Sequence, residues 1–128
     1  MIVVRGTIFL LLLLSAGCVR PKASQWGEAV DPSQSRPLSR ALHDYASSTQ
    51  ETVTLSGRIT EVCRSSGCWF VLADSSNGHE VQLYVDLTHG ATFTVSPEVL
   101  GRPAVVKGRI VGEKPDLKFH AVGLRILE

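Results

Sequence analysis

Apolar and polar residues alternate along the second half of the chain with the period of two that β-strands show. The first such run places Val53, Leu55 and Ile59 among polar neighbours. Further strand-like runs follow, separated by turn-forming residues, at 68–73, 79–85, 104–111 and 117–127. The pattern therefore predicts an all-β domain of five main strands.

Glycines interrupt three of these runs: Gly57, Gly108 and Gly123. Glycine inside a strand often marks a bulge or a sharp bend at a barrel corner. A long irregular connection, residues 86–101, separates the third run from the fourth. Five strands with such bends suit a small OB-fold-like Greek-key barrel over residues 53–128. A sandwich of similar size is the alternative.

The period changes to that of a helix before the first strand. Leu38, Leu42 and Tyr45 are spaced at i, i+4 and i+7, which predicts a short helix of about two turns. Ser35 and Pro37 form a suitable helix entry. We expect residues 18–52 to comprise a tether followed by this helical segment.

The N-terminus has the order of a signal peptide: Arg5, then an apolar run at residues 8–14, then small residues. The run is too short to span a bilayer as a helix. Its ending, Ser15-Ala16-Gly17-Cys18, resembles the lipobox of bacterial lipoproteins, in which the cysteine is acylated and becomes the first residue. Residues 1–17 are therefore the expected lipoprotein signal peptide and Cys18 the lipidation site. An ordinary secretory signal is the alternative.

Lipidation implies a place in the cell envelope, with the domain held on a membrane by its N-terminal lipid. Val19 is not the aspartate that commonly retains lipoproteins in the inner membrane. In a host with two membranes we expect the outer membrane, with the domain facing the periplasm.

Charge argues against nucleic acid as a partner. Cleavage before Cys18 removes Arg5 from the 13 basic residues and leaves 12, against 12 acidic residues. The formal net charge of the mature chain is then zero, whereas electrostatic binding of nucleic acid needs a concentrated basic footprint.

With Cys18 lipidated, two cysteines remain in the mature chain, Cys63 and Cys68, with four residues between them. A hairpin places facing residues about 4.5 to 5.5 Å apart at Cα, within disulfide range. An even pair in an exported protein predicts a disulfide. The alternative is that both thiolates bind Cu(I) or Zn(II). Zinc would need further ligands, and no spacing ties the candidate histidines His79, His89 and His120 to the pair.

Aromatic side chains on the predicted strands suggest a second kind of site. Trp69 and Tyr84 are candidates for a ligand-binding platform of the sort that OB barrels use. Arg58 and Lys107 also fall on strands and are candidates to line the same groove. Core packing for the aromatic residues and a solvated outer face for the basic ones are the alternatives.

Several segments of the mature chain resemble domain of unknown function 4920, a bacterial family of exported OB-like domains that are often lipoproteins. The matching positions run through nearly the whole mature chain: residues 26–29, 57–63, 67–70, Asp86, Phe93, Val95, Pro97, Gly101, Gly108 and residues 121–124. The cysteine-turn-cysteine-tryptophan segment is the most specific of them. The resemblance implies the fold and the compartment rather than an activity.

Catalytic motifs do not stand out: there is no paired-carboxylate arrangement, phosphate-binding glycine loop or ordered Ser-His-Asp set. We therefore expect a protein that is not an enzyme and needs no cofactor. The sequence predicts a membrane-anchored exported lipoprotein that acts as a non-catalytic, OB-fold-like binding module for a soluble ligand or protein partner that the sequence does not identify. The alternative is a Cu- or Zn-handling or redox protein that uses Cys63 and Cys68.

Overall fold

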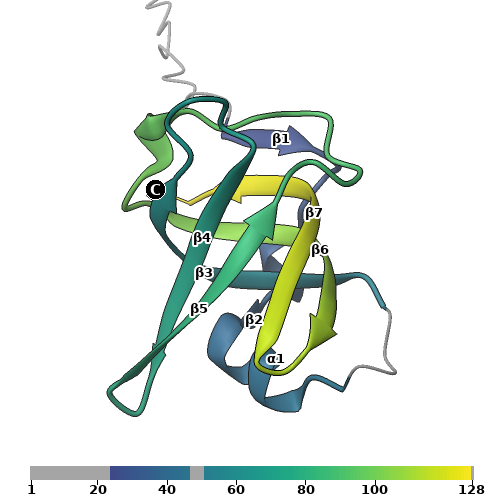
Figure 1. Ribbon diagram of the computed structural model, residues 1–128, viewed down its shortest axis with the longest axis vertical. Helices are drawn as coiled ribbons and strands as arrows, with labels where there is room; N and C mark the ends of the chain where they lie inside the picture. Colours follow the sequence, from purple (N-terminus) through teal and green to yellow (C-terminus); the bar gives the residue numbers. More distant parts are fainter. Residues whose placement is uncertain (1–23, 47–50, 128) are drawn as a thin grey trace, which may run out of the picture.

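The computed structural model describes residues 24–46 and 51–127 (Figure 1). The expected signal peptide, residues 1–17, and the expected lipidation site Cys18 lie outside this range.

Five strands close into a barrel. Their bounds are β3 Val53–Val62, β4 Trp69–Ser76, β5 His79–Asp86, β6 Pro103–Glu113 and β7 Asp116–Ile126. Around the ring, β3 pairs with β4, β4 with β5, β5 with β7, β7 with β6, and β6 with β3. Only the β5–β7 pair is parallel; the other four pairs are antiparallel. The predicted all-β, five-stranded barrel is confirmed.

Local sequence explains the tightest of its connections. The β4–β5 hairpin turns at Asn77-Gly78, where φ is 53° and 80°. Positive φ at both central residues is the requirement of the turn that matches the twist of two antiparallel strands, and Asn-Gly satisfies it best.

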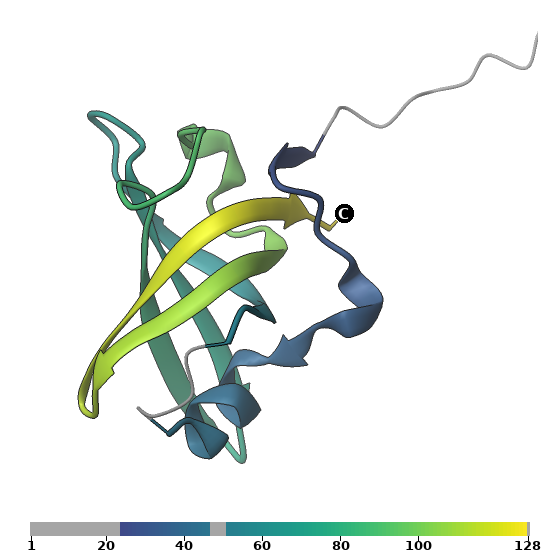
Figure 2. The same cartoon turned by 90° about the vertical axis from the view of Figure 1, so that its right-hand side faces the viewer.

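The N-terminal segment adds two short strands and a helix to the barrel. Strand β1, Gln25–Gly27, pairs antiparallel with β7, and β2, Arg36–Pro37, pairs parallel with β3. A 3₁₀ turn, η1 Pro32–Gln34, lies between them. Figure 2 shows this segment along one side of the barrel, leading to helix α1, Leu38–Asp44. The sheet thus begins well before the first predicted barrel strand.

Helix α1 confirms the predicted short helix. It begins directly after Pro37 and ends at Asp44, because the backbone of Tyr45 is extended. Leu38 and Ala41 are buried in the core, and Leu42 and Tyr45 pack against it from the edge. The helix lies across one end of the barrel (Figure 1). The Tyr45 hydroxyl donates a hydrogen bond to the Gly112 carbonyl at 3.0 Å, which ties the end of the helix to β6.

The barrel interior is apolar. Phe70 and Phe119 are the largest fully buried side chains, and aliphatic residues from all five barrel strands surround them. No polar or charged residue is buried in the described part of the chain. Within residues 24–46 and 51–127, no helix has the length and hydrophobicity needed to cross a membrane.

The long connection between β5 and β6 passes over the other end of the barrel. Its only regular part among the described residues is a 3₁₀ turn, η2 Pro97–Val99, with proline at its start. Val95 and Val99 are buried and attach the connection to the core. The connection also contacts the β3–β4 turn, because the Val95 amide donates to the Gly67 carbonyl at 2.9 Å.

Gly57 lies where β3 packs closely on β4, so a substitution at this position tests that packing. A Cβ at this position would lie 2.7 Å from the Ala73 carbonyl oxygen and 2.9 Å from Leu72 Cγ. We expect Gly57→Val to lower the free energy of unfolding by about 1 to 3 kcal/mol, because added bulk must push the strands apart. Thr54→Val on the same strand, a control of similar shape, should change it by less than about 0.5 kcal/mol. Urea denaturation measures both, and equal stabilities would contradict the close packing.

Candidate functional site

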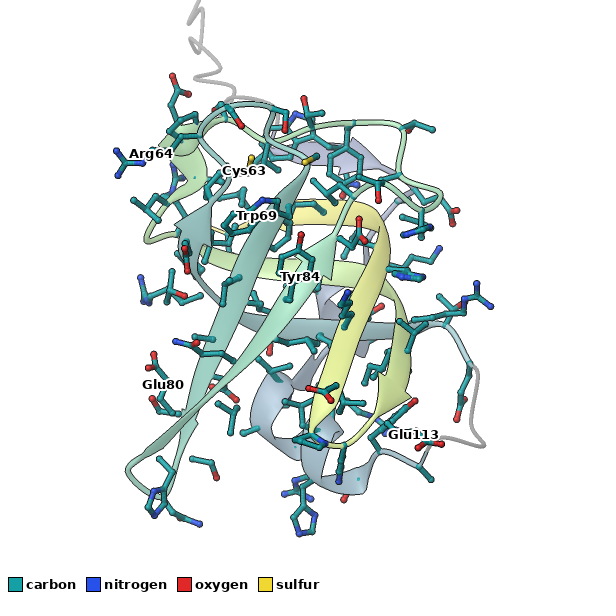
Figure 3. The ribbon with its side chains drawn as sticks, viewed as in Figure 1. Cys63, Arg64, Trp69, Glu80, Tyr84 and Glu113 are labelled. Atoms are coloured by element: carbon teal, nitrogen blue, oxygen red, sulfur yellow. The ribbon has the colours of Figure 1, made fainter. Side chains whose placement is uncertain are left out.

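The turn from Cys63 to Cys68 lies at the end of the barrel opposite α1 (Figure 3). Backbone hydrogen bonds hold it on several sides. The Cys63 amide donates to the Trp69 carbonyl at 3.1 Å, and the Gly67 amide donates to the Cys63 carbonyl at 3.2 Å. The Leu87 amide donates to the Cys68 carbonyl at 2.9 Å. The backbone that carries both thiols is therefore fixed to β4 and to the start of the β5–β6 connection.

Gly67 is required for this turn. Its φ is +64°, and a Cβ would lie 2.1 Å from the Val95 carbonyl oxygen. The left-handed conformation and the contact with another backbone both favour glycine. The Gly-Cys-Trp order thus has a structural cause: glycine makes the turn, and the cysteine and tryptophan that follow lead into β4.

The predicted disulfide is not present, because Cys63 and Cys68 are free cysteines. The reason is the register of the β3–β4 ladder. Ile59 pairs with Leu72, but Glu61 pairs with Val71, so Thr60 is an extra residue in a β-bulge.

The bulge moves Cys63 away from Cys68 by one position. Beyond it Val62 pairs with Phe70, and the Cys63 amide bonds to Trp69. If Thr60 paired with Val71 and the ladder continued without a bulge, Cys63 would face Cys68, as the spacing of the two cysteines had suggested. The sequence does carry a signal of the bulge. Two polar residues, Thr60 and Glu61, separate the inward-facing Ile59 and Val62, whereas strict alternation allows only one.

Serine hydroxyls link the two thiols. Cys63 Sγ lies 3.4 Å from Ser65 Oγ and 3.4 Å from Ser66 Oγ. Ser66 Oγ also donates to Cys68 Sγ at 3.0 Å, so one hydroxyl touches both sulfurs. Hydrogen bonds from Ser65 and then Ser66 lower the pKa of the Cys63 thiol to about 5. Cys63 is therefore a thiolate at neutral pH, the form of cysteine that binds metals and reacts as a nucleophile.

The structure brings together the two aromatic residues of the candidate ligand-binding platform. Trp69 and Tyr84 are stacked on the outer face of β4 and β5, with ring centroids 5.5 Å apart and an interplanar angle of 27°. Lys118 Nζ lies 5.9 Å from the centroid of the Tyr84 ring, and Tyr84 is 37% exposed. Figure 3 shows the two rings below the cysteine turn. The inward positions of the same strands hold Phe70 and Val85, so alternation directs these rings outward.

The basic candidates lie apart from this platform. Arg58 donates to the Gly101 carbonyl, and Lys107 Nζ forms an ion pair with Glu28 Oε1 at 3.0 Å. Of the four residues predicted to bind ligand, the structure brings together Trp69 and Tyr84.

The three candidate histidines also separate. His79 begins β5 at the far hairpin, where it pairs with Ser76. His89 and His120 meet on the outside of the barrel, with ring centroids 4.4 Å apart, and Asp86 joins them. Sequence reasoning missed Asp86. Its partner His120 is far along the chain, and only the parallel β5–β7 pairing brings the two together.

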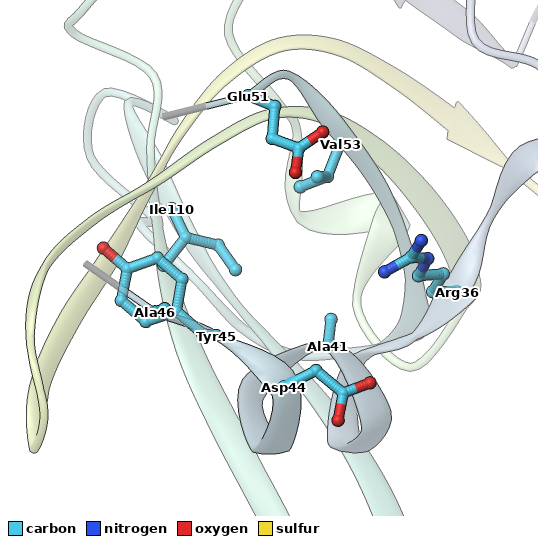
Figure 4. Close-up of a pocket in the computed structure, with 8 residues that line it drawn as sticks. All are labelled: Arg36, Ala41, Asp44, Tyr45, Ala46, Glu51, Val53 and Ile110. Carbon is cyan, nitrogen blue, oxygen red and sulfur yellow. The ribbon is translucent and has the colours of Figure 1, made fainter. Parts of the chain in front are cut away.

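A pocket at the helical end of the barrel was also not predicted. It lies between α1 and strands β3 and β6, with Ala41 and Ile110 at its wall and Arg36, Asp44 and Glu51 around it (Figure 4). Its residues Ala46 and Glu51 flank positions 47–50, which lie outside the described residues, so we assign no site there.

The Cys63 environment predicts an unusual thiol titration. In the Cys68→Ser variant, the ultraviolet absorbance of the thiolate should persist at neutral pH and disappear with a midpoint near pH 5. The combined Ser65→Ala and Ser66→Ala substitutions should move the midpoint upward, since they remove the hydrogen bonds that stabilise the thiolate. Adding Cys63→Ser should abolish the transition. A midpoint at the ordinary value of about 8.5 would contradict the proposed environment.

Comparisons with known proteins give no family. No protein-family model matches the chain, and no curated protein matches it. Among solved structures, the chain is similar to the hypothetical protein ygiW from E. coli, at 22% sequence identity and a TM-score of 0.49. The match covers 79% of this chain and 99% of that one. The assignment of a barrel depends on the strand pairing described above. Neither a site nor an activity is carried over from this likeness.

Proposed function

We propose that this chain is an exported, lipid-anchored, non-catalytic binding module, and that its ligand is a soft metal ion held by Cys63 and Cys68. The observation that supports this most directly is the Ser66 hydroxyl that touches both free thiols. Two neighbouring thiols on a turn fixed by backbone hydrogen bonds form a site that needs little reorganisation to bind.

The number of ligands favours Cu(I) over Zn(II). Soft thiolates select Cu(I), Zn(II) and iron–sulfur clusters, and structural zinc sites have four protein ligands. Within residues 24–46 and 51–127, the only group of three or more possible metal ligands contains neither cysteine. A pair of thiolates without further protein ligands suits Cu(I), which accepts low coordination numbers.

The proposed module is an OB-like barrel. Support comes from the ring of strands, in which the only parallel pair joins the third and fifth barrel strands, β5 and β7. This is a Greek-key arrangement of five strands, as in the OB-fold. Membership of domain of unknown function 4920 remains a prediction from the residues that resemble it.

Anchoring in the envelope is the part of the proposal that rests on the N-terminal sequence. Mass spectrometry of the mature protein should find Cys18 as the first residue, carrying a diacylglyceryl group and an amide-linked acyl chain. Replacement of Cys18 by serine should release the protein from the membrane fraction, because the protein then lacks its acyl chains. A mature N-terminus elsewhere, or an unmodified Cys18, would contradict the anchor.

Competition for Cu(I) tests the metal site. Reduced full-length protein should take one equivalent of Cu(I) from a chromophoric chelator such as bathocuproine disulfonate. Cys63→Ser and Cys68→Ser should each weaken binding at least a hundredfold, because each removes one of the two sulfur ligands. Arg64→Ala is the matched control, an exposed residue of the same turn whose loss should leave affinity unchanged.

Two results would count against this function. Wild-type protein that takes no Cu(I) would exclude the soft-metal site, and binding that survives both cysteine substitutions would place the metal elsewhere.

A redox role for the same pair is the alternative. Reversible two-electron oxidation of Cys63 and Cys68 by a thiol–disulfide buffer, without Cu(I) binding, would favour it.

A further inference from the structure

We propose that Asp86, His89 and His120 form a second metal site, separate from the thiols, that binds a divalent ion of intermediate softness such as Zn²⁺. The ligand atoms of these three side chains all lie within 4.8 Å of one another. Imidazole nitrogen and carboxylate oxygen are both ordinary zinc ligands. The class of ion that this site binds therefore differs from the soft ion proposed for the cysteine turn.

Strand pairing assembles two of the three ligands. Asp86 ends β5, and His120 is its partner in the parallel ladder with β7. The residues beside them in the same strands, Val85 and Phe119, are fully buried. Asp86 and His120 therefore project from the outer surface of the barrel, side by side. His89 approaches from the connection that follows β5.

A local turn orients the carboxylate. Asp86 Oδ1 accepts hydrogen bonds from the Thr88 amide at 2.7 Å and from the Thr88 hydroxyl at 2.5 Å. The other carboxylate oxygen, Oδ2, lies 3.5 Å from His89 Nε2. One oxygen thus holds the turn while the second faces the histidine. The side chain of Asp86 is 14% exposed, so its position is constrained on most sides.

The histidines need only a small movement to enclose an ion. Their rings are stacked with an interplanar angle of 26°. Ligand atoms around a tetrahedral zinc ion lie about 3.3 Å apart, as follows from metal–ligand distances of about 2.0 to 2.1 Å. The side chain of His89 is 59% exposed and is free to turn toward the other two ligands. Three protein ligands would leave one position of a tetrahedral ion for water or another ligand.

The protonation states suit metal binding. Burial, and then the neighbouring His89, lower the pKa of His120, whereas Asp86 opposes the shift. A lowered pKa favours the neutral imidazole, which is the form of histidine that binds a metal. The pKa of Asp86 is also below its ordinary value: burial raises it, but the hydrogen bonds from Thr88 and the charges of His89 and His120 outweigh burial. The carboxylate is ionised.

Two cations beside the site act against the ion. Arg109 is the ladder partner of His120 on β6, and Arg109 and Lys118 both lower the pKa of His120 through their charge. The Asp86 carboxylate offsets part of this repulsion. Because Arg109 carries no ligand atom of the cluster, its removal should strengthen the binding of a cation, whereas removal of a ligand should weaken it.

The experiment uses full-length protein without a polyhistidine tag, carrying Cys63→Ser and Cys68→Ser so that the thiols cannot bind the ion. Isothermal titration with Zn²⁺ should show one equivalent. His89→Gln and His120→Gln should each weaken binding at least tenfold, and Arg109→Gln should tighten it. His79→Gln, at the far hairpin, is the matched control and should leave affinity unchanged.

Long-range ¹H–¹⁵N spectra of the imidazole rings provide a second measurement. On addition of Zn²⁺, the ring nitrogens of His89 and His120 should shift, and those of His43 and His79 should stay in place. His89 lies on the surface, so His89→Gln should fold normally, and its thermal melting without Zn²⁺ checks this. No Zn²⁺ binding by the protein with Cys63→Ser and Cys68→Ser, or equal losses in His79→Gln and His89→Gln, would overturn the site. Neither result would bear on Cu(I) binding by the thiols.

Discussion

The short parallel pairing of β5 with β7 is the interaction on which the rest of the structure depends. It joins the ends of a sheet that would otherwise stay open, and it does so with the ladder pairs Tyr84–Lys118, Val85–Phe119 and Asp86–His120. The middle pair is buried and completes the core. The outer two pairs place a cation over Tyr84 and a histidine beside Asp86. Closure of the barrel and the chemistry of its outer surface therefore have one origin.

Much of the fold could be predicted, because local sequence patterns indicate its strands and its helix. Alternation located the five barrel strands, and the spacing of Leu38 and Leu42 indicated α1. Strands β1 and β2 were not recognised as strands, because two or three residues are too few for a period to show.

The candidate sites depend on register and on distant pairing, which local patterns specify poorly. Spacing brought Cys63 and Cys68 to one turn, but the bulge at Thr60 decided which residue each would face. Trp69 and Tyr84 were found because both lie on strands that pair with each other. The cluster of Asp86, His89 and His120 was not found, since His120 reaches it only through the parallel pairing of β5 with β7.

The bulge at Thr60 has a consequence for how related sequences should be interpreted. A homologue of the same length with an apolar residue at the position of Glu61 and a polar one at that of Val62 would keep strict alternation. Its strand would continue the Ile59–Leu72 register without a bulge and place its cysteines opposite each other. Such a protein would be suited to a covalent cross-link, whereas this chain presents two separate thiols. An exchange of polar and apolar residues at these two positions would thus divide a single family into cross-linked and thiol-bearing members. The cysteine spacing alone would not distinguish them.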